Sequence, residues 1–238
     1  MKSITKYLLL FFLTISLMTA SLVAVALISR DRIQTKSEES AEQLIRRNTA
    51  YYNLLGGVAG RSVLRPEDCS KIDQTADSYL LSIAYYLDSA HPLESVLWAR
   101  YYEGREDKTA PLKNMNESYH RSVTEEVPTN KQYLRYWHGS LILVRPLLMF
   151  LNLNQMKILF GAVIAILLSI LIWFLAKKQL RAEVVCLAIS MIAVSVWFVP
   201  VSLEYVWMFI LMLAVSIAAV VISTRGHERR IPILMFLR

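Results

Sequence analysis

Charged residues are missing from four long stretches of this sequence, and their absence excludes an ordinary water-soluble fold. The stretches cover residues 7–28, 158–176, 184–200 and 205–223, with 22, 19, 17 and 19 residues. A helix of about 17–25 uncharged apolar residues matches the hydrocarbon core of a bilayer. A chain of 238 residues is too short to enclose four such helices in a soluble core. We therefore predict four membrane-spanning helices.

Cysteine is also scarce, and common catalytic motifs are absent. The two cysteines, Cys69 and Cys186, fall in a polar segment and inside the third predicted span, so no disulfide framework is expected within one chain. No GxxxxGK(S/T), HExxH, CxxC or GxSxG motif occurs. The four histidines show no metal-ligand spacing. The sequence therefore predicts no dedicated metal site and identifies no cofactor.

Acidic residues are few outside the segment 29–156, and this imbalance produces the net charge of +7. The segment contains 16 basic and 16 acidic residues, whereas the remainder contains 10 basic and 3 acidic. The basic excess gathers at the ends of the predicted spans, at Lys2 and Lys6, at 177–181 and at 225–230. Short loops rich in Lys and Arg stay in the cytoplasm. We therefore predict a multi-pass cell-membrane protein with a cytoplasmic N-terminus and no nucleic-acid partner.

These observations predict a mainly α, polytopic membrane protein with three parts. Residues 1–28 hold an N-terminal transmembrane anchor, residues 29–157 form a mainly helical extracytoplasmic domain, and residues 158–238 contain spans 2 to 4. The anchor has an alternative interpretation as a cleaved signal peptide, although its apolar run exceeds the usual length of about 7–15 residues. Residues 231–238 start another apolar run, either the beginning of a fifth helix in a longer chain or a short interfacial tail.

Within the extracytoplasmic domain, apolar periodicity predicts helices over 35–55, 71–88 and 92–102. Residues 103–128 are charged and aperiodic, which predicts a surface loop. The apolar run 140–151 is too short to span a bilayer and contains Arg145-Pro146 in its middle. Because tyrosine and tryptophan residues precede it, as at a membrane surface, we predict an interfacial helix over 140–151.

Five residues are candidates for chemistry, each with a plainer alternative. Asp73 and Asp77 are one turn apart on the predicted helix 71–88, so they could bind a divalent cation or act as a general base. Their alternative is a solvated helix N-terminus, where acids are common. His138 could carry a proton at the membrane surface, or be a polar residue beside an aromatic belt. Arg135 and Arg145 could hold a lipid phosphate, or extend to the headgroups.

The predicted layout resembles the N-terminal part of membrane glycosyltransferases of the GT-C class. The shared features are a cytoplasmic N-terminus, a large acid-containing first external loop, an interfacial helix near its end, and further spans. The stretch 136–154, which begins Tyr-Trp-His-Gly and contains Arg145-Pro146, also resembles polytopic bacterial membrane proteins of uncharacterised function. GT-C enzymes usually carry an acid soon after the first span. Asp31 lies there, but between two arginines and without the usual acidic partner.

The resemblance implies transfer of a sugar from a polyprenyl-phosphate-linked donor at the external membrane face. Asp73 or Asp77 would then activate the acceptor hydroxyl or hold a metal, and Arg135 and Arg145 would bind the donor phosphate. The alternative hypothesis is a non-enzymatic component of envelope assembly or transport, whose external domain binds a partner. Under both hypotheses the lipid bilayer is a partner of the protein.

Overall fold

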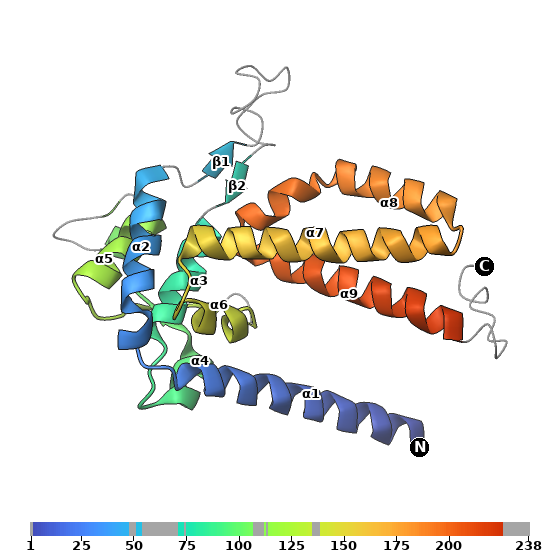
Figure 1. Ribbon diagram of the computed structural model, residues 1–238. Helices are drawn as coiled ribbons and strands as arrows, with labels where there is room; N and C mark the ends of the chain where they lie inside the picture. The colour runs from blue at the N-terminus through green and yellow to red at the C-terminus, as the bar shows by residue number, and fades with distance from the viewer. Residues whose placement is uncertain are drawn as a thin grey trace. The chain divides into compact units, whose positions relative to one another are not determined.

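The computed structural model describes residues 2–47, 51–53, 71–73, 75–106, 112, 114–134 and 139–225, and these are mainly helical (Figure 1). The chain divides into two compact units, Met1–Met156 and Lys157–Arg238, called here the N-terminal and C-terminal units. The elements are α1 (Lys2–Ala26), α2 (Asp31–Arg47), β1 (Tyr51–Asn53), β2 (Lys71–Asp73), α3 (Thr75–Tyr86), α4 (Pro92–Trp98), β3 (Arg100–Tyr101), η1 (Gly104–Glu106), α5 (Met115–Thr124), β4 (Lys131–Gln132), α6 (Leu141–Leu147), α7 (Leu153–Lys177), α8 (Arg181–Ala193), η2 (Val196–Val201) and α9 (Leu203–Arg225).

Three helices of the described chain are long and apolar enough to cross a membrane. They are Ile4–Ala26 in α1, Leu153–Lys177 in α7 and Leu203–Ile222 in α9. Each coincides with one of the charge-free stretches, so three of the four predicted long apolar helices are confirmed, as is the mainly helical fold. Their exposed surfaces are apolar on nearly every side, as expected for helices whose solvent is lipid.

The fourth charge-free stretch, 184–200, does not form one continuous helix, and the prediction is wrong in that respect. The helix α8 ends at Ala193, and the 3-10 helix η2 begins at Val196. Between them Ser195 adopts the left-handed conformation, with φ of 51°, which breaks the ladder of hydrogen bonds. Pro200 then has no N–H to donate to the carbonyl one turn earlier, so η2 cannot continue as a regular α-helix.

The C-terminal unit packs α7, α8 and α9 around an aliphatic core. Its centre is formed by buried side chains from α7, η2 and α9: Ile164, Leu171, Leu175, Val199 and Leu213. Partly buried apolar side chains of all three helices surround this centre. The close approach of η2 to α7 is visible at Gly161, where an added Cβ would lie 3.4 Å from Pro200.

The described residues between α1 and α7, called here the interhelical domain, pack α2, α3 and α5 together. Along α2, the inward positions Ile33, Ser37, Ser40, Ala41 and Leu44 recur at helical spacing and are buried. Two short antiparallel pairs complete the domain, one joining β1 to β2 and the other joining β3 to β4. The charged positions of α2 face outward, so this part of the chain is built as water-soluble proteins are.

Several predicted helix boundaries in the interhelical domain are wrong. The first helix begins at Asp31 and ends at Arg47, and Tyr51–Asn53 forms strand β1 instead of its last turn. The predicted helix 71–88 consists of strand β2 followed by α3 from Thr75. The predicted loop 103–128 contains α5, whose N-cap Asn114 accepts a hydrogen bond from the Glu117 N–H. Periodicity gave no sign of strands this short, because two or three residues carry too little pattern.

The N-terminus of α7 is capped by side chains from two sources. Asn152 and Gln155 form a reciprocal capping box, each side chain accepting from the other's backbone N–H at 3.1 and 2.9 Å. From α2, Ser40 Oγ accepts from the Leu153 N–H and Gln43 Oε1 accepts from the Asn154 N–H, at 2.9 and 3.0 Å. The N–H groups that a helix start leaves unpaired are thus bonded to the interhelical domain.

Candidate functional site

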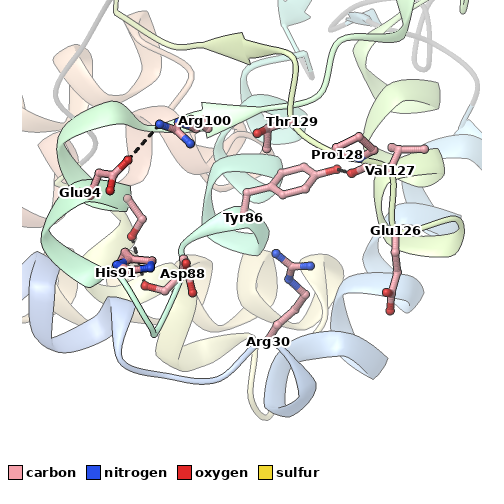
Figure 2. Close-up of a pocket in the computed structure, with 11 residues that line it drawn as sticks. Arg30, Tyr86, Asp88, His91, Glu94, Arg100, Glu126, Val127, Pro128 and Thr129 are labelled. Atoms are coloured by element: carbon pink, nitrogen blue, oxygen red, sulfur yellow. Dashed lines mark hydrogen bonds and ion pairs between the residues drawn. The ribbon is translucent and has the colours of Figure 1, made fainter.

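A polar cleft with a volume of about 320 Å³ opens on the surface of the interhelical domain (Figure 2). Its walls come from three places in the sequence: the turn after α1, the segment from the end of α3 into α4, and the loop after α5. The lining residues are Arg30, Tyr86, Asp88, His91, Glu94, Ser95, Arg100, Glu126, Val127, Pro128 and Thr129. Nine of the eleven have a polar or charged side chain, which distinguishes the cleft from an apolar ligand pocket.

One wall of the cleft is the short helix α4. Pro92 occupies its first turn, where the missing N–H is no loss, and Ala99 ends it in the left-handed conformation with φ of 41°. The Ala99 N–H bonds back to the Ser95 carbonyl. These local features fix a single face of α4 toward the cleft, with Glu94 and Ser95 on it.

Two of the lining residues, Arg30 and Tyr86, belong to a cation–aromatic cluster that also includes the buried Tyr85. The Arg30 guanidinium lies 5.0 Å from the ring centre of Tyr85 and 5.6 Å from that of Tyr86. A cation over an aromatic face is attracted by the negative charge of the ring face. The Tyr86 hydroxyl donates to the Val127 carbonyl at 2.5 Å, and burial raises the pKa of Tyr86 to about 12. Tyr86 therefore acts as a neutral donor that fixes the loop after α5.

Charges of both signs are close to balance in the cleft. Three carboxylates (Asp88, Glu94 and Glu126) face two guanidiniums (Arg30 and Arg100) and the imidazole of His91. Glu94 and Arg100 form an ion pair at 3.0 Å, with both side chains about half exposed. Such an exposed pair contributes little to stability, so both groups are available to a binding partner. Asp88 Oδ1 accepts the Ala90 N–H at 2.9 Å, which shapes the turn before α4.

The two predicted acids do not share a helical face. Asp73 lies in strand β2, paired in register with Tyr51, and Asp77 lies in the first turn of α3. Asp77 is fully buried, close in sequence to buried Ser78, whose hydroxyl donates to Asn116 Oδ1 at 2.5 Å. The side chain of Asp73 lies outside the part of the chain that the structure describes. A metal or substrate approaching from solvent does not reach the Asp77 carboxylate in this conformation.

Arg145 was predicted at the headgroups, yet its side chain is fully buried inside the N-terminal unit. Its guanidinium donates to the carbonyls of Ala84 at 2.6 Å, Leu87 at 2.8 Å and Ile28 at 2.5 Å. Two of these acceptors belong to the C-terminal end of α3, where helix carbonyls lack partners and positive charge is favourable. Burial lowers the pKa of Arg145 to about 10, which still leaves the group charged at neutral pH.

The interfacial helix predicted over 140–151 appears as α6, Leu141–Leu147, followed by a turn. Leu141, Val144 and Leu148 are buried with Arg145, whereas Leu143 and Phe150 are exposed. The helix is therefore two-sided, with Arg145 on its inner side. The remaining candidates, Arg135 and His138, lie outside the described residues.

No three His, Cys, Asp or Glu side chains lie close enough to hold a metal ion within the ranges that the structure describes. The cleft residues were not identified from the sequence. The Pro92 helix start is a local signal, but nothing in the sequence brings Arg30, Tyr86 and Glu126 together, because about 40 to 56 residues separate them and no motif links them. Comparison of the chain with protein-family models, curated proteins and solved structures finds no match.

Proposed function

We propose that this chain is a multi-pass protein of a cell envelope whose interhelical domain lies outside the cytoplasm and binds a protein partner through the polar cleft. One observation carries the proposal. The two predicted chemical groups with described side chains, Asp77 and Arg145, are enclosed in the domain, whereas charged side chains of both signs line the open cleft. A binding surface needs accessible groups, and a catalytic acid or phosphate ligand needs contact with its substrate.

The charge balance of the cleft favours a protein partner over a phosphate-bearing donor. A phosphate site presents a surplus of basic groups and backbone N–H donors, whereas three carboxylates here would repel an anion. Alternating charges instead match a partner surface with the opposite pattern and disfavour partners without it. The cleft thus supports the non-enzymatic of the two functions considered.

The proposed topology has four crossings, with the N-terminus and the turn between α7 and α8 in the cytoplasm. Lys177, Lys178 and Arg181 at that turn support this orientation. The third crossing would be made by α8 and η2 together. Thirteen α-helical residues give about 20 Å and six 3-10 residues about 12 Å, which together match a core of about 30 Å. A broken helix is tolerated at this depth where protein covers the break, and Val199 of η2 is part of the core.

Cysteine accessibility tests the topology. In a Cys69→Ser, Cys186→Ser background, Thr124→Cys places a thiol on exposed α5, and Gln179→Cys places one at the exposed turn after α7. A membrane-impermeant maleimide added to intact cells should modify position 124 and not position 179. Labelling of position 179 and not of position 124 would show that the topology is the inverse of the one proposed.

Site-directed photocrosslinking tests the partner-binding function. A photoreactive amino acid at His91, in the cleft, should give one discrete crosslinked protein in cells that carry the native gene. Charge reversal at the two cleft arginines (Arg30→Glu with Arg100→Glu) should abolish the crosslink, and the same probe at Thr124 on α5 is the matched control.

The transferase hypothesis is the competing outcome. It now depends on Asp73, Arg135 and His138, whose side chains lie outside the described residues. Turnover of a polyprenyl-phosphate-linked sugar by the full-length protein, lost in Asp73→Asn, would replace the partner-binding proposal by an enzymatic one.

A further inference from the structure

The helix α4 exposes three large apolar side chains within seven residues. None of its residues is buried, and Leu93, Leu97 and Trp98 are 52%, 64% and 47% exposed. Leu93 and Leu97 are four residues apart and so lie on the same side of the helix, about 40° apart. Glu94 and Ser95 of the same helix line the polar cleft. The helix is therefore amphipathic, with Leu93 and Leu97 on its uncovered apolar side. Trp98, about 100° from Leu97, lies at the edge between that side and the side that lines the cleft.

The position of α4 is fixed by α1. The two helices pack together, and Figure 1 shows α4 beside the end of α1 that is far from the N-terminus. Near this end Leu22, Val25 and Ala26 are buried, whereas most of the earlier residues of α1 are exposed and apolar. With 25 residues α1 is about 37 Å long, more than a hydrocarbon core of about 30 Å. Its last turns therefore reach the headgroup level, and α4 lies against them.

The helix α6 also packs against α1 and has a similar exposed side. Leu143 and Phe150 are 44% and 69% exposed, although Leu141, Val144 and Leu148 are buried. Two short helices that contact the end of the same span thus expose apolar side chains. Tryptophan at such a level is typical of the membrane–water interface, where its ring meets both phases.

We propose that α4 is a second interfacial helix, lying in the headgroup region of the bilayer that α1 spans, with Leu93 and Leu97 inserted at the ends of the acyl chains and Trp98 beside them at headgroup level. This inference rests on α1 crossing the membrane, as in the proposed function. The occupant of the apolar side is lipid, because α4 packs against the end of α1, a helix that is exposed, apolar and long enough to cross a bilayer. Amphipathic helices lie in this region with their apolar side about 5–10 Å deep. The cleft, on the polar side of α4, then opens just above the lipid headgroups.

Depth-dependent quenching tests the inference on the full chain. The protein with Cys69→Ser and Cys186→Ser carries one new thiol, either Leu97→Cys on α4 or Thr124→Cys on α5, labelled with a nitrobenzoxadiazole fluorophore. It is reconstituted in vesicles of phosphatidylcholine and phosphatidylglycerol. Both positions are exposed, so neither substitution disturbs packing, and α5 packs on α2 and α3. The two labels thus differ only in the surface on which they sit.

We expect lipids with a nitroxide near the headgroup to quench the label at 97 several-fold more than the label at 124, and aqueous iodide to do the reverse. Iodide quenching of position 97 equal to that of 124 would overturn the inference, because α4 would then face water. Protection of position 97 from both quenchers would also overturn the inference, since protein would then cover α4. If that protection increased with protein concentration, the covering protein would be a second copy of this chain. The maleimide experiment can fail without affecting this one. If the domain lies on the cytoplasmic side, α4 contacts the other leaflet of the bilayer, and the depth of position 97 stays as proposed.

Discussion

The interhelical domain and the C-terminal unit bury different kinds of side chain. The interhelical domain encloses nine polar or charged residues: Ser37, Ser40, Asp77, Ser78, Ser82, Asn116, Ser118, Ser122 and Arg145. Among the described residues of the C-terminal unit only Lys157 and Ser202, both at ends of α-helices, are buried and polar. The outer surfaces differ in the opposite sense, with charges on α2 and α5 and leucine, isoleucine and valine on α7 to α9.

This difference is what we expect of a chain with one region adapted to water and another adapted to lipid. In water, burial of apolar surface stabilises the fold, so polar groups are enclosed only where hydrogen bonds compensate their lost hydration. In lipid, the surroundings are as apolar as the core, so helices associate through close packing rather than through burial. The stability of the interhelical domain should therefore depend on specific hydrogen-bond partners, and the stability of the C-terminal unit should depend on close packing of its side chains. Four experiments with substituted variants test this contrast.

The largest effect is expected for Arg145→Met. The change leaves the carbonyls of Ile28, Ala84 and Leu87 buried without their donor, which should cost the domain about 3–5 kcal/mol. Pulse proteolysis in urea, read at cleavage sites within 29–152 of the detergent-solubilised protein, measures the loss. Arg30→Met is the control, because Arg30 is only half-buried and contacts the rings of Tyr85 and Tyr86 without a hydrogen bond to them, so its loss should cost about 1 kcal/mol or less. Equal losses for the two arginines would contradict the structural role of Arg145.

A matched pair of leucines compares the two cores directly. Leu81 in α3 and Leu213 in α9 are both essentially inaccessible. Leu81→Ala should cost about 2–5 kcal/mol, because transfer to water and a cavity both contribute. Leu213→Ala should cost less, since only packing is lost where lipid replaces water. Urea unfolding of the domain and detergent-driven unfolding of the helices give the two values. If Leu213→Ala were as costly as Leu81→Ala, the C-terminal unit would be solvated by water.

A hydroxyl in each region provides a smaller test. Ser40→Ala removes the acceptor of the Leu153 N–H at the start of α7 and should cost about 1 kcal/mol, as for other caps. Ser190→Ala removes only a bond from the hydroxyl to the Cys186 carbonyl in its own helix, and should change stability by less than about 0.5 kcal/mol. Hydrogen exchange at Leu153 should speed up in the first variant alone. Unchanged exchange there would mean that Ser40 does not cap α7.

The smallest effect concerns the pH dependence contributed by Glu39. Hydrogen bonds from Lys36 at 2.6 Å and from Asn152 at 2.8 Å lower the pKa of Glu39 below its ordinary value of 4.5. A carboxyl group whose pKa is lower in the folded state than in the unfolded state stabilises the fold at pH values above its unfolded pKa. This stabilisation is lost as the pH falls through the pKa of the folded state. The melting temperature of the wild type should therefore exceed that of Glu39→Gln most above about pH 5 and converge with it toward pH 3. A constant difference across that range would exclude the charge of Glu39 as its cause.

Local composition was sufficient to predict the long apolar helices, because their signal lies within each stretch. The break at Ser195 was missed, since a single residue with positive φ leaves hydropathy unchanged. Asp73 and Asp77 were placed on one helix because apolar periodicity continues through the strand β2 into α3. The depth of Arg145 was missed for a different reason. Its three acceptors lie far away in the sequence, and a charge within an apolar run has the same pattern whether it reaches headgroups or carbonyls.

The cleft could not be predicted for the same reason as the partners of Arg145. Its walls meet only after α1, α3, α4 and the loop after α5 have folded together. The sequence of each wall segment, taken by itself, is typical of an ordinary polar turn. The feature that did predict part of it was local: Pro92 indicated the start of the helix that became α4. Individual helices were therefore predictable from the sequence, whereas sites formed by side chains from several elements were not.

The bonds of Arg145 also impose an order on the assembly of the chain. Its acceptors Ile28, Ala84 and Leu87 precede it by 117, 61 and 58 residues, so all three are synthesised first. Until α3 has formed and met the end of α1, the guanidinium lacks its three acceptors, and α6 cannot reach its final packed position. Docking then draws the charge inward and closes the domain. A chain in which α3 has not folded would leave Leu141, Val144 and Leu148 of this region exposed together with Arg145.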